Sequence, residues 1–277
     1  MYDVMSITKA AIGLLYHKHE TEFPRDADFE FTTIGNALNM RCGKKDNSWD
    51  YDNFRKGVEN NVSLCKYAAD TLNTAEDADG MEYNNLAYQL LASNMRNVAD
   101  RFGKMMGDQA QNTLEIETSW NGKAIYFKKG DGWKWEHTKS GEPLGPHGLH
   151  MTQKACKDFG ELAKSHVLTM SASEKELVEN WNGIGSNEFT HYWNGWFLTA
   201  NNAYAVGYVV QVIALTPNGV ITQVYDENWD DDMDNEKNKG KHPRWNFIVT
   251  IESGVNTRLM LKDTPISGSV QAFSFKF

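Results

Sequence analysis

The sequence of 277 residues has no excess of positive charge, few cysteines and no long apolar run. Its 28 basic and 37 acidic residues give a net charge of -9, which argues against nucleic acid as a partner and disfavours anionic ligands. The three cysteines are odd in number, widely spaced and in no metal-ligand pattern, so we interpret Cys42, Cys65 and Cys156 as reduced structural thiols. No apolar run approaches the roughly 18 residues that cross a bilayer, and no membrane span is expected.

A secretory signal peptide and a calcium-binding loop are also missing from the sequence. The N-terminus lacks the basic region, apolar stretch and cleavage site of a signal peptide. A signal removed before Met1 would leave no trace, so the sequence assigns no compartment. The acidic segment from Asp226 to Glu236 contains seven carboxylates, but an EF-hand counted from Asp230 would meet Asn235 and Lys241 where it needs Gly and a carboxylate. We interpret this segment as a solvated loop and expect no metal.

An apolar fraction of 40% is enough for a substantial core, and we expect a soluble globular protein with one domain over residues 1–277. The N-terminal segment predicts a buried amphipathic helix from Ser6, because serine is preferred at helix starts and apolar residues follow at helical spacing. Further helices are expected around residues 34–40, 62–72 and 83–100. The first 100 residues are therefore mainly helical.

The rest of the chain alternates between strand and helix signals. The stretch LEIETSWNGKAIYFKKGDGWKWEH alternates apolar and polar residues around Asn-Gly and Gly-Asp-Gly turns, which is typical of short antiparallel strands. A helix is expected near Thr152, and strands from Tyr192 onward, with two β-branched runs joined through Pro-Asn-Gly and another strand in NFIVTIES. This order predicts an α+β protein in which helices flank an antiparallel sheet. Its mainly helical part covers about residues 5–190 and its sheet part about residues 190–277.

Ser6 and Lys9 stand three residues apart, which places both side chains on one face of a helix, one turn apart. If the pair is buried, loss of solvation lowers the pKa of the Lys9 amine, which can then accept the Ser6 proton. The backbone N–H of Ser6 at the helix start can also bind an oxyanion. A helix start followed by a solvent-facing lysine explains the same letters, and it fully explains a second pair, Ser63 and Lys66. The spacing alone therefore does not identify a nucleophile.

Tyr83 and Asn85 form a second candidate pair, directly before a predicted helix. A phenol and a carboxamide two residues apart in a loop can face one cleft, with the phenolate as proton acceptor and the amide positioning a substrate carbonyl. Taken alone, a tyrosine at a helix start is more often an anchor in the core. The pair gains weight only from its place relative to Ser6 and Lys9.

Several stretches, in this order, resemble the serine β-lactamase and penicillin-binding-protein superfamily, in particular its class C and esterase-like branch. DVMSITKAAIGLL is similar to the Ser-x-x-Lys helix, MEYNNLAYQLLASNM to the Tyr-x-Asn motif, and GLHMTQKACKDFGELAK to the Gly-Leu, Thr, Asp-Phe-Gly helix start. TIGNALNMRCGKKDNSWDYDNF and YAVGYVVQVIALTP resemble the branch around 6-aminohexanoate-dimer hydrolase, with Cys42 in place of the usual Ser and Val210 in place of a Gly. The resemblance covers nearly the whole chain from Asp3 to Tyr225.

The resemblance implies roles for residues that are far apart in the sequence. Ser6 would be the nucleophile, and Lys9 together with Tyr83 would take its proton. Tyr83 would then protonate the leaving group. Asn85 would position the substrate, and Tyr51 would project into the cleft from its loop. No metal or organic cofactor would be needed.

The third motif of the superfamily is where this sequence departs most. Lys139-Ser140-Gly141 has the letters, but it precedes the Gly-Leu helix start and leads into a Glu-Pro-Leu-Gly-Pro turn. We therefore place the strand beside the nucleophile at Ala205-Val206-Gly207, which has no Lys or His to hold a substrate carboxylate and so disfavours penicillin as substrate. The backbone N–H of Tyr208 would join that of Ser6 in an oxyanion hole, and Gly207 would leave room for the acyl group.

The N-terminus is a second departure from the superfamily. Its members usually have some dozens of residues before the Ser motif, whereas five precede Ser6. N-terminal sheet strands are thus missing or replaced, and the alternating segments NFIVTIES and SGSVQAFSFKF are candidates to replace them. Trp193 and Trp196 are expected in the core. His147 and His150 have no carboxylate partner at useful spacing and are expected to be structural.

We expect a serine hydrolase that cleaves a small-molecule ester or amide through an acyl-enzyme. The alternative is a catalytically silent protein of the same fold that binds a peptide, a cell-wall fragment or a partner protein. The uncharged Ala205-Val206 pair, Val210 and the short N-terminus favour this alternative. Reactivity of Ser6 toward a fluorophosphonate distinguishes the two.

Overall fold

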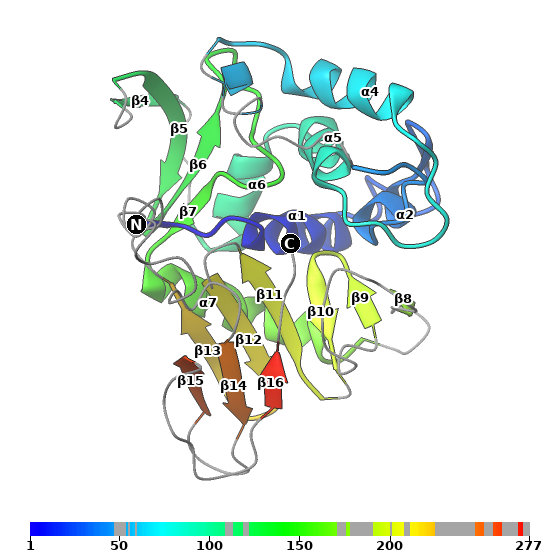
Figure 1. Cartoon of the computed structure of the whole chain (residues 1–277). Helices are drawn as coiled ribbons and strands as arrows, with labels where there is room; N and C mark the ends of the chain where they lie inside the picture. The colour runs from blue at the N-terminus through cyan, green and yellow to red at the C-terminus, as the bar shows by residue number, and fades with distance from the viewer. Residues whose placement is uncertain are drawn as a thin grey trace, which may run out of the picture.

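The computed structural model describes most of the first 224 residues and three later strands. The described residues are 1–46, 54, 56–58, 60–108, 113–118, 122–170, 176–177, 191–199, 201–207, 211–224, 247–251, 257–261 and 271–273. Within them, helices flank antiparallel sheets, which confirms the predicted α+β class (Figure 1).

Helix α1 (Ile7–Lys18) lies at the centre of the molecule, between a layer of helices and a six-stranded sheet (Figure 1). All residues from Ile7 to Tyr16 are buried, including the polar Thr8 and Lys9. The sequence predicts a helix with one apolar face, but a helix enclosed on all sides is a core helix. The Ser-x-x-Lys pair therefore stands at the start of a buried helix, with Ser6 directly before it and Lys9 in its first turn.

The helical layer on one side of α1 contains α2 (Ile34–Leu38), α4 (Leu64–Thr74), α5 (Asn85–Met95) and α6 (Val98–Met105). Helices α2, α4 and α5 each begin at a side chain that accepts a backbone N–H, which satisfies part of the open helix end; these side chains are Thr33, Ser63 and Asn84. The single helix expected over residues 83–100 is instead two. Arg96 and Asn97 both have a φ of 48°, outside the helical region, and this breaks the helix.

A five-stranded antiparallel sheet borders the start of α1. It has the order β1-β7-β6-β5-β4, formed by β1 (Tyr2–Asp3), β4 (Glu115–Thr118), β5 (Ala124–Gly130), β6 (Trp133–His137) and β7 (Leu149–Met151). The strands predicted between residues 114 and 137 are thus confirmed. Asp3 of β1 pairs with His150 of β7, so the residues before Ser6 are anchored to this sheet. Residues 5–190, the part with mainly helical signals, therefore also contain a sheet.

A six-stranded antiparallel sheet lies on the other side of α1, in the order β13-β12-β11-β10-β9-β8. Its strands are β8 (Glu176–Leu177), β9 (His191–Trp193), β10 (Trp196–Leu198), β11 (Ala203–Gly207), β12 (Gln211–Thr216) and β13 (Gly219–Gln223). Helix α7 (Gln153–Val167) packs on β12 and β13. The two predicted β-branched runs are three strands, because Gly207 already pairs antiparallel with Gln211 inside the first run.

The hairpin of β9 and β10 packs directly against α1. Its two turn residues, Asn194 and Gly195, have φ angles of 46° and 91°, the left-handed conformation that a tight hairpin requires. A Cβ on Gly13 of α1 would lie 2.0 Å from the Asn194 carbonyl oxygen, and a Cβ on Gly195 would lie 2.4 Å from the Ala10 nitrogen. Glycine at both positions is therefore what lets the sheet approach the central helix so closely.

The remaining described strands form two small sheets. β2 (Asp28–Phe29) pairs with β3 (Thr32–Thr33), and β14 (Phe247–Ile251) pairs with β15 (Thr257–Leu261) and β16 (Gln271–Phe273). The C-terminal segments proposed as replacement strands thus form strands as predicted. Their described pairings join them to each other, in a sheet separate from the six-stranded one.

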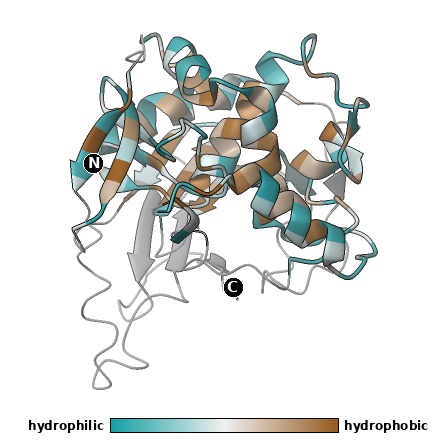
Figure 2. Ribbon diagram, turned by 90° about the horizontal axis from the view of Figure 1, so that it is seen from above, coloured by the Kyte–Doolittle hydropathy of each residue, from teal (hydrophilic) through white to brown (hydrophobic). Residues whose placement is uncertain are grey.

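One hydrophobic core runs through α1, the helical layer and the inner faces of the sheets. Seen from above, the apolar segments gather in the centre and the hydrophilic ones at the periphery (Figure 2). Trp193 and Trp196 are 2% and 0% exposed, which confirms them as core residues. In the part of the chain that is described, no helix is long and apolar enough to cross a membrane.

Candidate active site

Ser6 lies in the tight turn between β1 and α1. The Asp3 carboxylate accepts a hydrogen bond from the backbone N–H of Met5 at 2.8 Å. Met5 has a φ of 50°, a backbone conformation that residues other than glycine seldom adopt. Ser6 itself is in the N-cap position of α1, yet its side chain caps no backbone N–H. Its hydroxyl, partly exposed, is directed to other side chains instead.

Two functional groups converge on the Ser6 oxygen. The Lys9 Nζ and the Tyr83 hydroxyl each lie 2.8 Å from Ser6 Oγ, within hydrogen-bond distance. Lys9 Nζ also donates to the carbonyl oxygen of Pro146 at 2.9 Å and lies 5.0 Å from the centre of the Tyr83 ring. A hydroxyl, an amine and a phenol from segments 77 residues apart in sequence thus meet at one point.

Burial changes the protonation of this group. Lys9 is 1% exposed, and loss of solvation lowers the pKa of its ammonium from 10.5 to about 7, although the Asp46 charge opposes the change. Burial raises the pKa of the Tyr83 phenol well above its usual value, with the hydrogen bond to Ser6 acting in the opposite direction. At neutral pH, Lys9 is therefore the group able to accept a proton, and Tyr83 is the group able to donate one.

Tyr83 is held in place by a clamp that we define as residues 40–46 hydrogen-bonded to residues 76–85. The clamp closes on both sides of Tyr83, which stands two residues before α5. Its backbone bonds are Lys45 N to Glu76 O at 2.9 Å, Ala78 N to Gly43 O at 3.0 Å, and Glu82 N to Met40 O at 2.8 Å. Asn84 adds side-chain bonds from its Nδ2 to the Lys44 carbonyl at 3.0 Å and to Cys42 Sγ at 3.2 Å. Cys42, the residue in place of the usual Ser, is thus part of the clamp.

Asp46 is the last residue of the first clamp segment and is bonded to the start of α5. Nothing in the sequence indicated that Asp46 belongs to the site. Its Oδ2 accepts the backbone N–H of Asn85 at 2.6 Å, so a carboxylate lies at the positive end of the helix. Burial raises the pKa of Asp46 to about 7, against the lowering effects of the Asn85 hydrogen bonds and the Lys9 charge. Asn85 is therefore engaged with Asp46, and its role toward a substrate carbonyl stays a prediction.

Strand β11 ends beside the turn that carries Ser6. A Cβ on Gly207 would lie 2.4 Å from the Val4 carbonyl oxygen and 3.2 Å from Met5 Cβ. The glycine is thus required because the strand touches the turn that carries Ser6, and the space that it would leave for an acyl group stays a prediction. Ala205 and Val206 are buried and bring no charge to this strand. The expected oxyanion donor Tyr208 and the cleft residue Tyr51 lie outside the described residues.

The competing Ser-x-x-Lys pair has the plain structural role expected of it. The Ser63 hydroxyl accepts the Lys66 backbone N–H at 3.3 Å and caps α4, while the exposed Lys66 side chain pairs with Asp70 at 2.6 Å. The other rejected motif, Lys139-Ser140-Gly141, forms a turn after β6, where the Ser140 backbone N–H donates to Asn61 Oδ1 at 2.8 Å. Neither group lies at Ser6.

His147 and His150 are both buried, as expected of structural residues. His150 nevertheless has an acidic partner that its spacing in the sequence could not reveal. His150 Nε2 lies 3.8 Å from Glu136 Oε2 across strands β7 and β6. The expectation that it lacks a carboxylate partner is therefore wrong, because the pairing of neighbouring strands brings the two together. Among the described residues, no three His, Cys, Asp or Glu side chains are placed to hold a metal ion.

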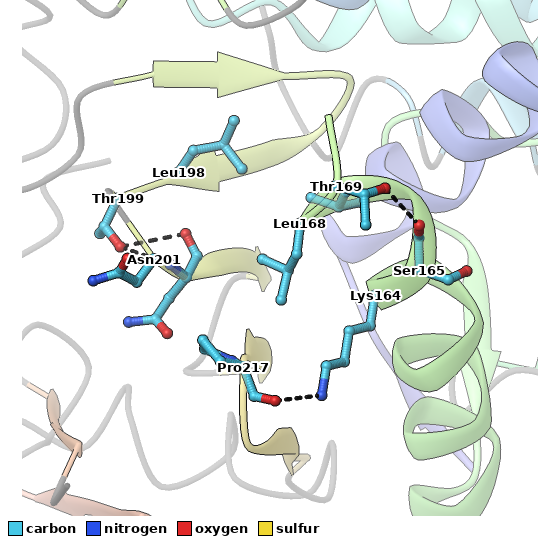
Figure 3. Close-up of a pocket in the computed structure, with 10 residues that line it drawn as sticks. Lys164, Ser165, Leu168, Thr169, Leu198, Thr199, Asn201 and Pro217 are labelled. Atoms are coloured by element: carbon cyan, nitrogen blue, oxygen red, sulfur yellow. Dashed lines mark hydrogen bonds between the residues drawn. The ribbon is translucent and has the colours of Figure 1, made fainter. Parts of the chain in front are cut away.

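A pocket of about 440 Å³ lies at the other end of β11 (Figure 3). It is lined by the C-terminal turn of α7, the end of β10 and the turn between β12 and β13. Lys164 Nζ donates to the Pro217 carbonyl oxygen at 3.0 Å, and Ser165 Oγ donates to the Leu162 carbonyl oxygen within its own helix at 3.1 Å. Lys164 and Ser165 are thus each bonded to a backbone carbonyl and not to each other, and Ser6 does not line this pocket.

The chain has the fold of serine β-lactamases and penicillin-binding proteins. A protein of Bacillus anthracis described as a 6-aminohexanoate-dimer hydrolase superposes with a TM-score of 0.54 and 14% sequence identity over 80% of this chain and 66% of its own. The chain therefore spans slightly less than two thirds of that protein. A penicillin-binding protein of Bacillus halodurans superposes with a TM-score of 0.51 and 15% identity, over 84% of this chain and 83% of its own. No family model and no curated protein sequence matches the chain.

Proposed function

We propose that the protein is a serine hydrolase that cleaves small esters or amides through an acyl-enzyme. The observation that carries this proposal is the position of Ser6 Oγ, 2.8 Å from both the Lys9 amine and the Tyr83 hydroxyl. A nucleophile needs a base within hydrogen-bond reach and a group that fixes the base. Here the Pro146 carbonyl, 2.9 Å from Lys9 Nζ, holds the amine.

The proposed reaction assigns one step to each group. Neutral Lys9 accepts the Ser6 proton through its lone pair while it donates to Pro146, and Ser6 Oγ attacks the substrate carbonyl. Tyr83 delivers a proton to the leaving group and is reprotonated from Lys9, which leaves an ester on Ser6. A water molecule activated by the same pair then releases the acid. The backbone N–H groups of Ser6 and Tyr208 are the proposed oxyanion donors.

The neutral strand beside Ser6 supports a substrate without a carboxylate at that side. Ala205 and Val206 have uncharged side chains, so neither can present a charge to a ligand. Lys9 is the cation nearest to the nucleophile, and burial lowers the pKa of its amine to about 7. We therefore propose neutral esters or amides, and not penicillins, as the substrate class.

The test is covalent labelling with a fluorophosphonate, followed by intact-protein mass spectrometry and by hydrolysis of p-nitrophenyl acetate and butyrate. We expect one label per chain, lost in Ser6→Ala and retained in Ser63→Ala, because the two serines differ in their partners and not in their local sequence spacing. Equal labelling of both variants would show that Ser6 is not the nucleophile.

The second candidate is a catalytically silent binding protein of the same fold, favoured by the uncharged Ala205-Val206 pair. It predicts a folded protein that no fluorophosphonate labels and that turns over no ester. Failure of labelling in a sample with a cooperative unfolding transition would therefore favour this alternative.

A further inference from the structure

We propose that Asp46 is a positioning residue of this site: its carboxylate fastens the first turn of α5 behind Tyr83, and its charge makes Lys9 hold its proton more tightly. This inference rests on the proposed function, because it concerns how the Ser6 base is set. It adds a residue that neither the Ser-x-x-Lys nor the Tyr-x-Asn pattern contains.

Asp46 holds the start of α5 in place through a hydrogen bond. Tyr83 lies between the Glu82 backbone bond to Met40 and the Asn85 backbone bond to Asp46 Oδ2, at 2.8 and 2.6 Å. The bond from Asn85 to Asp46 is therefore the last hydrogen bond of the clamp, and it follows Tyr83 where the chain enters α5. Its carboxylate complements Asn84, whose Oδ1 accepts the Ala87 N–H at 2.8 Å, so two side chains close the same helix end.

Asp46 also acts on Lys9 through its charge. Asp46 is the acidic group whose charge acts on Lys9, and Lys9 acts on Asp46 in return. The other groups facing Lys9 are hydroxyls, a ring and a carbonyl, which carry no charge at neutral pH; they are Ser6, Tyr83, Tyr88 and Pro146. Cys42 and Glu82 also belong to the clamp, and the charges of Asp46 and Glu82 both act on the Cys42 thiol. Asp46 is therefore the carboxylate that acts on the amine, and because burial raises its own pKa to about 7, it carries its full charge only above that pH.

The sign of the effect follows from this arrangement. A negative charge near an ammonium stabilises the charged form, so removing it favours the neutral amine. An uncharged residue at position 46 should therefore let Lys9 act as base at lower pH. A purely structural role for Asp46 would instead lower activity by the same factor at every pH.

The experiment compares pH profiles of fluorophosphonate labelling rate in the full chain. In Asp46→Asn, whose amide oxygen can still accept the Asn85 N–H, we expect the acid limb of the profile to move to lower pH by at most about one pH unit, because Asp46 carries only part of its charge near pH 7, with the plateau changed less than about threefold. Asp46→Glu keeps the charge and should leave the limb in place. Asp70→Asn removes an exposed carboxylate paired with Lys66 and is the matched control, with no movement expected.

An unmoved limb in Asp46→Asn, or one moved to higher pH, would overturn the inference. If Asp46→Asn does not fold, Asp46→Ser supplies an uncharged residue that can also cap a helix, and the same outcomes apply. A titration of the Lys9 Cε resonance by NMR, assigned with Lys9→Gln, gives a readout without turnover. If no variant or wild-type sample is labelled, the proposed function fails, while the shift of the Lys9 titration in Asp46→Asn still decides the inference.

Discussion

Replacing Lys9 by methionine should abolish turnover and at the same time stabilise the folded protein. Lys9 is 1% exposed and its pKa falls from 10.5 to about 7 on folding. Each unit of this change is worth about 1.4 kcal/mol, so burial of the charged side chain costs about 5 kcal/mol below pH 7. Methionine has a similar shape and carries no charge.

The size of the gain depends on what Lys9 leaves behind. Ser6 Oγ and the Pro146 carbonyl lose their partner at 2.8 and 2.9 Å, which costs about 1 kcal/mol each. We therefore expect Lys9→Met to be more stable than the wild type by about 3 kcal/mol at pH 6. Unfolding in urea, followed by tryptophan fluorescence, measures this difference.

The free energy of unfolding should also depend on pH in a way that distinguishes the wild type from Lys9→Met. Because the folded pKa of Lys9 is below the unfolded one, the folded state releases a proton between pH 7 and 10.5 that the unfolded state keeps. The wild type should thus gain stability relative to Lys9→Met as pH rises, by about 3 kcal/mol between pH 6 and pH 9. Lys66→Met, which removes an exposed lysine, should show no such slope. Parallel curves for wild type and Lys9→Met would refute the assignment of a neutral Lys9.

Three further predictions follow from the same geometry. Ester hydrolysis by the wild type should rise about tenfold per pH unit up to about pH 7 and then level off, as steady-state kinetics would show, because only neutral Lys9 accepts the Ser6 proton. Tyr83→Phe should lower kcat by about 100-fold or more without unfolding the protein, since it removes the proton donor 2.8 Å from Ser6 Oγ. Gly13→Ala should destabilise the protein by about 3 kcal/mol in urea unfolding, because its Cβ would lie 2.0 Å from the Asn194 carbonyl oxygen.

The two substitutions each have a matched control within the chain. Tyr88→Phe removes a buried phenol that donates to the Leu38 carbonyl at 2.7 Å, and it should lower stability more than it lowers kcat per folded molecule. Gly43→Ala adds a Cβ into open space at a φ of 75°, so only backbone strain of about 1 kcal/mol is expected. A flat pH profile, an active Tyr83→Phe variant, or equal losses in Gly13→Ala and Gly43→Ala would contradict the respective argument.

Some features of the site could not be read from the sequence, for identifiable reasons. Asp46 lies in a loop without periodicity, and only the pairing of that loop with residues 76–85 brings it to α5. The partner of Lys9 at position 146 is a backbone carbonyl, and every residue has one, so no letter marks it. His150 meets Glu136 through strand pairing, which depends on register and not on distance along the chain.

The sequence by itself determined the helices and strands whose signals are local. Ser63 and Thr152 begin helices because their side chains satisfy an open backbone N–H, and the predicted Gly-Asp-Gly turn joins β5 to β6 with a φ of 76° at Gly132. The order of the motifs also predicted the fold class. These properties depend on neighbours a few residues away, which the sequence displays directly.

Only the tertiary structure decided that Ser6 and Ser63, with the same Ser-x-x-Lys spacing, differ in character. Ser63 caps its helix and its lysine lies in solvent, whereas Ser6 lies beside a buried amine and a phenol from a distant segment. Proximity of this kind arises when packing encloses α1 on all sides, and burial then shifts the protonation of Lys9. Reactivity depends on desolvation and distance, and both are properties of the folded chain.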